Sequence, residues 1–383
     1  MAWTRHQVFL ALLMVVTGSI NTLSTKWADK LQSKSRDGVV RDFDHPFFQA
    51  SCMFLGELLC LVAFKALYKI FSRTSNGSED VNELTKGNRD FNQFKLFIPA
   101  MLDMTSTSLM YIGLNLTYAS SFQMFRGAVI IFVGVLSVTF LERVLKKREW
   151  SGILFVIVGL IVVGLADFIN KDTTGNTHGK NDIITGDLLI LIAQIITATQ
   201  MVIEEKFVTG LDIPPLQAVG WEGVFGFTVL ALLQIPFYFI KVGPPFSNND
   251  RGVLEDALDA FVQLGNNYRL ILAISGTVLS IAFFNFAGIS VTKEMSATTR
   301  MVLDSVRTFV IWMFSLAFTW QQFHWLQLLG FSLLLFGMCL YNGITCTVCI
   351  IYIRNKITHL RYRHLNDDVV ENRAADEAYD TSA

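Results

Sequence analysis

Charged side chains lie inside several long apolar segments of this chain, where each would cost roughly 2.5–3.5 kcal/mol to insert into a membrane. In the segment 296–319, Arg300, Asp304 and Arg307 are spaced i, i+4, i+7 and share one helix face. Asp304 can neutralise only one of the two arginines, so we expect this face to keep a positive charge and to avoid lipid. Because a guanidinium group matches phosphate or carboxylate and stays charged, the spacing predicts a binding face for an anionic group.

A second polar face occurs in the segment 119–141, where Gln123 and Arg126 lie one turn apart. With a helix rise of about 1.5 Å per residue, Arg126 is expected roughly 10 Å from one membrane surface and Arg307 roughly 16 Å from the other. The two arginines would then approach the midplane from opposite sides, which is where transporters built from inverted repeats bind their substrates.

Other polar residues could complete such a site. Asp103 is followed one turn later by Thr107, and Asn285 lies in the apolar segment 269–291. Hydroxyl and amide groups at these positions could hydrogen-bond a polar group such as a sugar. Glu57 and Glu222 also lie within apolar segments, but nearer their ends, where an interfacial position is an equally good interpretation.

A purely structural interpretation of the same charges stays open. Asp103 could pair with Arg126, and Asp304 could pair with Arg307. Such pairs would tie helices together without binding a solute. Burial of a charge is tolerated in either case only when a partner compensates it.

The composition requires a membrane for these segments. The chain has 383 residues, of which 52% are hydrophobic and only 16% charged, whereas soluble proteins carry about 25% charged residues. A helix needs roughly 20 apolar residues to cross the hydrocarbon. The expected spans are 8–27, 47–70, 95–116, 119–141, 150–169, 184–207, 215–240, 269–291, 296–319 and 323–346. They are apolar throughout rather than alternating, which predicts an all-α integral membrane protein and excludes a transmembrane barrel.

Enzymatic chemistry has no support in the sequence. Five of the six histidines, His6, His45, His178, His359 and His364, lie outside the expected spans, and His324 is the second residue of the last span, next to the loop. We therefore expect no catalytic residues, no metal site, no cofactor and no histidine proton relay within the membrane. The spacing of Cys346 and Cys349 lacks a second pair of metal ligands. A net charge of −1 argues against a nucleic-acid partner.

Loop charges predict the orientation. Lys and Arg are more numerous in the loops on the N-terminal side, so both termini are expected in the cytosol. The sequon at Asn76 would then be cytosolic and unglycosylated. The first apolar segment continues past Gly18, which favours a retained helix over a cleaved signal peptide. The polar segment 354–383 is expected to be a disordered cytosolic tail.

The chain also contains a weak internal repeat. The motif at 46–50, Pro-Phe-Phe-Gln-Ala, recurs as Pro-Pro-Leu-Gln-Ala at 214–218. The matching glycines are Gly113 with Gly288, Gly152 with Gly330, and Gly159 with Gly337. The expected units are a first five-helix repeat at 1–170, a loop at 171–183 and a second repeat at 184–353. Because five is odd, the second unit would enter the membrane from the opposite side, as in alternating-access transporters.

Several of these strings resemble a known family. The segments 120–127 and 186–189 resemble the drug/metabolite transporter superfamily, and 283–294 with 296–300 resemble the F subfamily of solute carrier family 35. The resemblance implies ten transmembrane helices in two inverted five-helix repeats around a central cavity. It also implies transport, in the wider family often of nucleotide sugars in exchange for a nucleotide monophosphate.

The sequence thus predicts a secondary transporter of a small, anionic or nucleotide-like solute. The expected substrate-binding residues are Asp103, Gln123, Arg126, Asn285, Arg300, Asp304 and Arg307. The alternative is a membrane scaffold or regulator that acts on protein partners through its tail. The resemblance and the tail motif Tyr362-Arg-His-Leu365 favour an organelle membrane, a lysosome or endosome before the Golgi or a mitochondrion. Nothing in the sequence excludes a homodimer.

Overall fold

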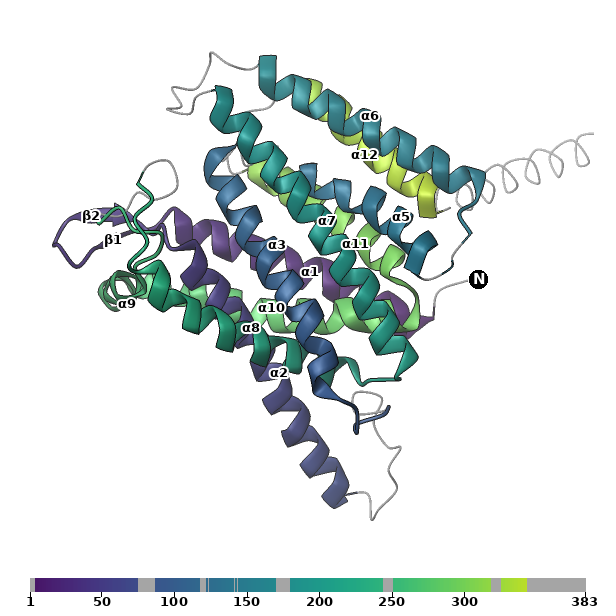
Figure 1. The fold of residues 1–383 in the computed structure, drawn as a ribbon, viewed down its shortest axis with the longest axis horizontal. Coiled ribbons are helices and arrows are strands. Elements are labelled where there is room, and N and C mark those ends of the chain that lie inside the picture. The colour runs from purple at the N-terminus through teal and green to yellow at the C-terminus, as the bar shows by residue number, and fades with distance from the viewer. Residues whose placement is uncertain are drawn as a thin grey trace, which may run out of the picture.

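Every expected apolar segment contains a helix in the computed structural model (Figure 1). The structure describes residues 4–74, 87–117, 122, 124–140, 142, 144–169, 180–243, 251–317 and 325–342. The long helices are α1 (Arg5–Asp29), α2 (Pro46–Thr74), α3 (Phe97–Leu116), α5 (Val129–Phe140), α6 (Lys147–Ile169), α7 (Lys180–Gly210), α8 (Pro215–Phe237), α10 (Tyr268–Glu294), α11 (Ala297–Ala317) and α12 (Trp325–Asn342). Expectations for Asn76, for the loop 171–179 and for the tail 354–383 with its Tyr362 motif lie outside the described residues, as do those for Cys346 and Cys349.

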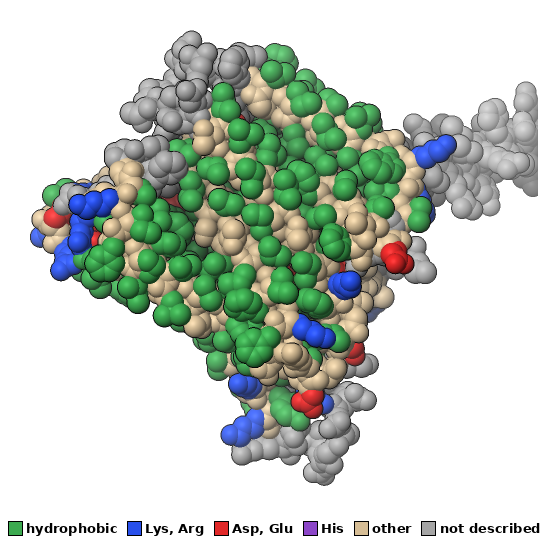
Figure 2. Space-filling view, viewed as in Figure 1, with side chains coloured by type: hydrophobic (Ala, Val, Ile, Leu, Met, Phe, Trp, Pro, Cys, Tyr) green, Lys and Arg blue, Asp and Glu red, His purple; other side chains and the backbone are tan. Residues whose placement is uncertain are grey.

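Six of these helices are long and apolar enough to cross a membrane. They are Arg5–Asp29, Pro46–Ile70, Lys147–Leu165, Ile183–Gly210, Pro215–Phe237 and Tyr268–Glu294. Helix α11 carries three charged side chains, at Arg300, Asp304 and Arg307, and the apolar helical stretches Arg126–Phe140 and Leu328–Tyr341 are shorter. Figure 2 shows apolar side chains over the middle of the visible face and charged ones toward its edges, as expected for a lipid-facing surface.

Four antiparallel helix pairs make the most extensive contacts, namely α1 with α10, α2 with α8, α3 with α7, and α6 with α12. Glycines allow the close approach in each pair. A Cβ at Gly159 would lie 2.9 Å from the carbonyl oxygen of Gly330, and a Cβ at Gly152 would lie 2.7 Å from that of Gly337. The prediction that these repeated glycines let two helix backbones approach closely is therefore confirmed. The glycines of α6 lie directly against the glycines of α12.

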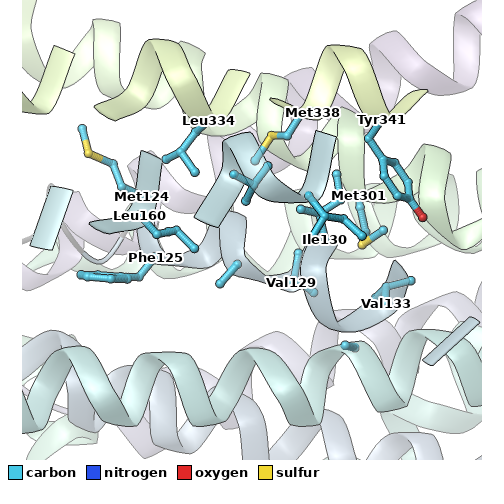
Figure 3. Close-up of a cluster of buried hydrophobic side chains, with 14 of the residues drawn as sticks. Met124, Phe125, Val129, Ile130, Val133, Leu160, Met301, Leu334, Met338 and Tyr341 are labelled. Carbon is cyan, nitrogen blue, oxygen red and sulfur yellow. The ribbon is translucent and has the colours of Figure 1, made fainter. Parts of the chain in front are cut away.

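A buried apolar cluster joins the last helix pair to the rest of the bundle (Figure 3). It brings together side chains from the segment around η3 (Arg126–Ala128), from α5 and α6, and from α11 and α12. Its labelled members are Met124, Phe125, Val129, Ile130, Val133, Leu160, Met301, Leu334, Met338 and Tyr341. The 3₁₀ turn η3 interrupts the fourth expected span, so Arg126 lies at a break rather than inside a regular helix.

One side of the bundle carries extramembrane structure, and we call it the hairpin side. The strands β1 (Gln32–Lys34) and β2 (Val40–Asp42) form an antiparallel hairpin between α1 and α2, a small addition to the expected all-α fold. The hairpin rests on the short helix α9 (Ala257–Asn266). The hydroxyl of Ser33 donates to the carbonyl oxygen of Gln263 at 2.7 Å, and that of Ser35 donates to Asp259 at 2.7 Å.

His45 lies at the centre of this region, outside the spans as expected but only 2% exposed. Its Nδ1 is 2.8 Å from Glu255 Oε1, and its Nε2 is 3.6 Å from Asp259 Oδ2. The second oxygen of Glu255 accepts from the backbone N–H of Phe47 at 2.9 Å and so caps the start of α2. We call His45, Glu255 and Asp259 the histidine clasp.

The clasp is held by charge. Burial alone would lower the pKa of His45, but its hydrogen bonds to Asp259 and Glu255 raise it from 6.5 to about 9. In return, the hydrogen bond from His45 holds the pKa of Asp259 well below its usual range, although burial alone would raise it. The ring is therefore an imidazolium between two carboxylates at neutral pH.

Because the folded pKa of His45 lies above its unfolded value of 6.5, the clasp stabilises the fold fully below that pH and loses this contribution as pH rises through about 9. We expect the unfolding temperature of the detergent-solubilised protein to fall across this interval. His45→Asn should lower it at neutral pH and remove that part of the pH dependence. The exposed His6→Asn is the control and should behave as wild type. An unchanged pH profile in His45→Asn would contradict the clasp.

Gly223 provides a test of the α2–α8 pair. A Cβ there would lie 2.5 Å from the carbonyl carbon of Glu57, which belongs to a backbone that cannot swing away. Gly223→Ala should therefore cost about 1–3 kcal/mol of stability through overpacking. Gly210→Ala is the matched control, because nothing lies within 4 Å of its added Cβ. Thermal unfolding should separate the two variants, and equal melting temperatures would refute the close approach.

Candidate functional site

A cavity of about 540 Å³ lies between the helices. On the hairpin side its wall begins at Asp42 and His45. On the other side it reaches Ile289, near the C-terminal end of α10, and Arg300, near the N-terminal end of α11. Small-molecule sites are commonly clefts of about 300–1,000 Å³. The cavity therefore has room for a metabolite-sized solute inside the helical bundle.

The structure gathers the residues expected from the sequence around this cavity. Asp103 comes from α3, Arg126 from η3, Asn285 from α10, and Arg300, Asp304 and Arg307 from α11, and all six line the wall. Gln123 lies outside the described residues. Helices far apart in the sequence thus contribute to a single chamber.

Arg126, Asp304 and Arg307 form one charged group, which we call the positive pole. Asp304 Oδ1 is 2.7 Å from Arg307, and Asp304 Oδ2 is 3.6 Å from Arg126. One carboxylate is thus shared by two guanidinium groups, which leaves one positive charge in excess. The pairing of Asp304 with Arg307 is confirmed, whereas Arg126 is paired with Asp304 and not with Asp103.

Arg307 is buried and incompletely satisfied. Its Nε and Nη2 have no hydrogen-bond partner, because the short ion pair with Asp304 does not have hydrogen-bond geometry. The guanidinium carbon lies 4.6 Å from the ring centre of Phe284. A Cβ at Gly18 would lie 2.5 Å from Arg307 Cδ, so the glycine of α1 provides the space for this side chain. The guanidinium group of Arg307 therefore has hydrogen-bonding capacity that the described residues do not use.

Arg300 does not contribute the excess charge that the sequence predicts. Its Nη1 lies 2.5 Å from Oε1 of Glu204 on α7, and Glu204 is fully buried. Gly288 leaves room for the guanidinium, since an added Cβ would lie 2.9 Å from Arg300 Nε. The expectation that Arg300 or Arg307 is left without a carboxylate partner is wrong, because Asp304 pairs with Arg307 and α7 supplies Glu204 to Arg300.

Glu204 was missed because it stands at the polar end of an expected span. In the sequence Glu204-Glu205-Lys206 reads as an interfacial charge run. The structure continues α7 to Gly210, which places Glu204 more than one turn inside the helix. The one sequence signal for the burial of Glu204 would be a helical pattern that continues past Lys206, and this signal is weak.

Three further acids line the cavity within electrostatic range of Arg300, and we call Glu57, Asp103 and Glu222 the acidic pole. Glu57 and Glu222 are 3% and 6% exposed, so the interfacial interpretation of these residues is wrong. Glu57 accepts a hydrogen bond from the Asn285 amide, and Asp103 Oδ1 accepts from the Thr107 hydroxyl at 3.4 Å. The cavity therefore presents two regions of opposite charge.

Comparisons with known proteins give this chamber a context. Residues 6–214 match the family model described as nucleotide-sugar transporter, and residues 184–343 match the EamA-like transporter family. Solute carrier family 35 member F6 of Pongo abelii is 57% identical over 345 residues, which cover 90% of this chain and 91% of that protein. The chain belongs to solute carrier family 35. This family comprises solute transporters, so this solute carrier is a multi-pass membrane protein and not an enzyme.

More distant relatives extend the likeness. The UDP-galactose transporter of Schizosaccharomyces pombe is 25% identical over 164 residues, covering 43% of this solute carrier and 46% of that protein. The structure also superposes on a protein of known crystal structure with a TM-score of 0.55 and 11% sequence identity. The match covers 90% of this chain and 99% of that one. At that identity the structural match shows a shared fold alone.

The Glu204–Arg300 pair gives a test of the site geometry. Glu204→Gln leaves Arg300 buried without a counter-charge, which should cost about 3–5 kcal/mol of stability. In the double variant Glu204→Gln/Arg300→Gln both charges are gone, and much of that loss should be recovered. Thermal unfolding in detergent compares the double variant with each single variant and with the wild type. Additive destabilisation in the double variant would show that the two side chains do not interact.

Proposed function

We propose that this solute carrier is a secondary transporter that moves a small organic anion of the nucleotide or nucleotide-sugar class by alternating access. The observation that carries the proposal is the positive pole, in which Arg126 and Arg307 both line the cavity and share the single carboxylate of Asp304. An anionic group bound beside these arginines would balance the excess positive charge.

The helix contacts support two repeated units. Let the helices of the first unit, α1, α2, α3, α5 and α6, correspond in that order to α7, α8, α10, α11 and α12 of the second unit. Each contact between the units should then have a counterpart in which both helices are replaced by their equivalents. The counterpart of α1–α10 is α7–α3, that of α1–α11 is α7–α5, and the α2–α8 and α6–α12 pairs are their own counterparts. All six of these contacts are present. This symmetry supports ten transmembrane helices in two inverted five-helix repeats, at 1–170 and 184–353, as in the drug/metabolite transporter fold.

The two ends of the cavity differ in their contacts. At the end opposite the hairpin, Lys293 Nζ lies 2.7 Å from Asp212 Oδ1 and donates to the carbonyl oxygen of Ile213 at 3.0 Å. These contacts fasten α10 to the turn between α7 and α8. On the hairpin side, the cavity wall continues up to Asp42 and His45. In the proposed cycle the Lys293 contacts break when the cavity opens toward the other side.

The class of solute follows from charge, size and kinship. A nucleotide carries phosphate oxygens that suit Arg307 and Arg126 in a bidentate or shared arrangement. The relative from Schizosaccharomyces pombe is named a UDP-galactose transporter, which makes UDP-galactose and UMP reasonable first probes. Asn285 and Asp103 would contact polar groups of the solute. The proposed location is an organelle membrane of the endosomal or lysosomal system, with both termini in the cytosol.

The test is exchange of external UDP-galactose against internal UMP in proteoliposomes. We expect Arg307→Gln to lower the uptake at least about tenfold, since truncating one partner of a buried charge pair costs about 2–5 kcal/mol. Arg269→Gln is the matched control, because Arg269 lies on the hairpin side away from the cavity and is exposed. It should transport as wild type does. Uptake by Arg307→Gln at the wild-type rate would remove Arg307 from the binding site.

A further inference from the structure

The deep part of the cavity holds more acids than arginines. The acids that line it are Glu57, Asp103, Glu222 and Asp304, and the arginines are Arg126, Arg300 and Arg307; Glu204 is fully buried against Arg300 and is not part of the lining. The remaining charged lining residues, Lys26, Asp29, Lys30, Asp42, Asp44 and His45, lie at the hairpin-side end of the cavity. Glu204 is used by Arg300, and Asp304 is shared by Arg126 and Arg307. Among the described residues, Glu57, Asp103 and Glu222 of the acidic pole have no ion-pair partner, and Asp103 alone also lies within electrostatic range of Arg126.

Glu222 is the least satisfied member of the acidic pole. It is 6% exposed, lines the cavity, and its Oε1 has no hydrogen-bond partner. Glu57 has the amide of Asn285 as donor, but an amide supplies no charge. Buried carboxylates of this kind are tolerated when a bound cation or proton removes their charge.

The surroundings of the two glutamates are mostly acidic. Glu222 is within electrostatic range of Asp103 on α3, Glu204 on α7, Glu57 on α2 and Arg300 on α11. Glu57 has the same acidic neighbours, Asp103 and Glu204, and the same single cation, Arg300. From α10 it meets the neutral amide of Asn285. Since Arg300 is already paired with Glu204, these acids compete for one positive charge.

The geometry favours a proton over a metal ion. No group of three or more His, Cys, Asp or Glu side chains among the described residues could hold a metal. A hard cation such as Na⁺ or Ca²⁺ needs several oxygen ligands at once, whereas a proton needs one carboxylate oxygen. Glu222 lines the cavity and its buried Oε1 has no hydrogen-bond partner, so this oxygen can take up a proton.

We propose that Glu222 and Glu57 form a proton-binding site of this transporter, separate from the anion site at the positive pole. Hydronium transfers its proton to Glu222 Oε1 and leaves as water, and the carboxylate becomes a neutral carboxylic acid. An anion bound at Arg307 cancels the excess positive charge of the positive pole. Proton uptake at the acidic pole then compensates for the added negative charge, so proton and anion bind cooperatively.

This inference rests on the proposed transport function, but protons can be tested without knowing the solute. Proteoliposomes adsorbed on a solid-supported membrane are exposed to an acidic jump with no organic substrate. Wild type should give a transient inward charge displacement. Glu222→Gln should lose it to the level of empty liposomes. Glu57→Gln should weaken the current without abolishing it. The substitution removes one carboxylate, but the carbonyl oxygen of the new amide can still accept the hydrogen bond from Asn285.

The controls separate folding, the type of ion and the transport function. Glu294→Gln removes an exposed carboxylate at the end of α10 and should leave the current unchanged. Each variant is first required to elute as a single species in gel filtration; a misfolded Glu222→Gln is replaced by Glu222→Ala, which must also lose the current. Exchange of UDP-galactose for UMP at equal pH reports the proposed function independently.

Two results would overturn the proton site. One is a wild-type current that is missing or that survives in both glutamine variants. The other is a current evoked by a Na⁺ jump at constant pH and not by protons. If exchange fails while the Glu222-dependent proton current persists, the anion assignment is wrong and the proton site stands. If exchange proceeds without any proton current, the proton site is wrong and the anion assignment stands.

Discussion

The structure depends on the cost of placing charge inside a membrane. Helix α11 carries Arg300, Asp304 and Arg307 on one face, and each must be compensated within the bundle. Glu204 from α7 and Arg126 from η3 provide that compensation, at 2.5 Å and 3.6 Å. Meeting this requirement draws η3, α7 and α11 together. The cavity is the space that these pairings leave between the helices.

Glycine determines how closely the helices can bring such groups. Gly18 makes space for Arg307, Gly288 for Arg300, and Gly223 lets α8 lie directly on α2 at Glu57. That last contact places Glu57 and Glu222 beside the same chamber. Backbone approach, which carries no chemistry itself, therefore decides which charges share one cavity and which face lipid. Substitution of a single one of these glycines would rearrange charges as well as packing.

The two charged regions suit a coupled transporter. One arginine pair shares one acid and keeps a positive charge, while three other acids of the lining have no ion-pair partner among the described residues. An anion and a proton would each relieve a different imbalance. A chamber that is stable only when both or neither is bound would favour their joint movement. The histidine clasp on the hairpin side is charged at neutral pH and gives that end a firm frame.

The sequence by itself determined the membrane class, the positions of the helices and six of the residues that line the cavity. Apolar length fixes a span, and a charge within it has few places to go, so Arg126, Asp304 and Arg307 could be assigned to the interior. Their partners were decided by tertiary structure alone. Glu204, Glu57 and Glu222 looked interfacial because depth was judged from segment ends, whereas burial depends on helix length and on which helices meet. Only the folded chain shows that Glu204 cancels Arg300, and that the expected anion site faces an acidic region.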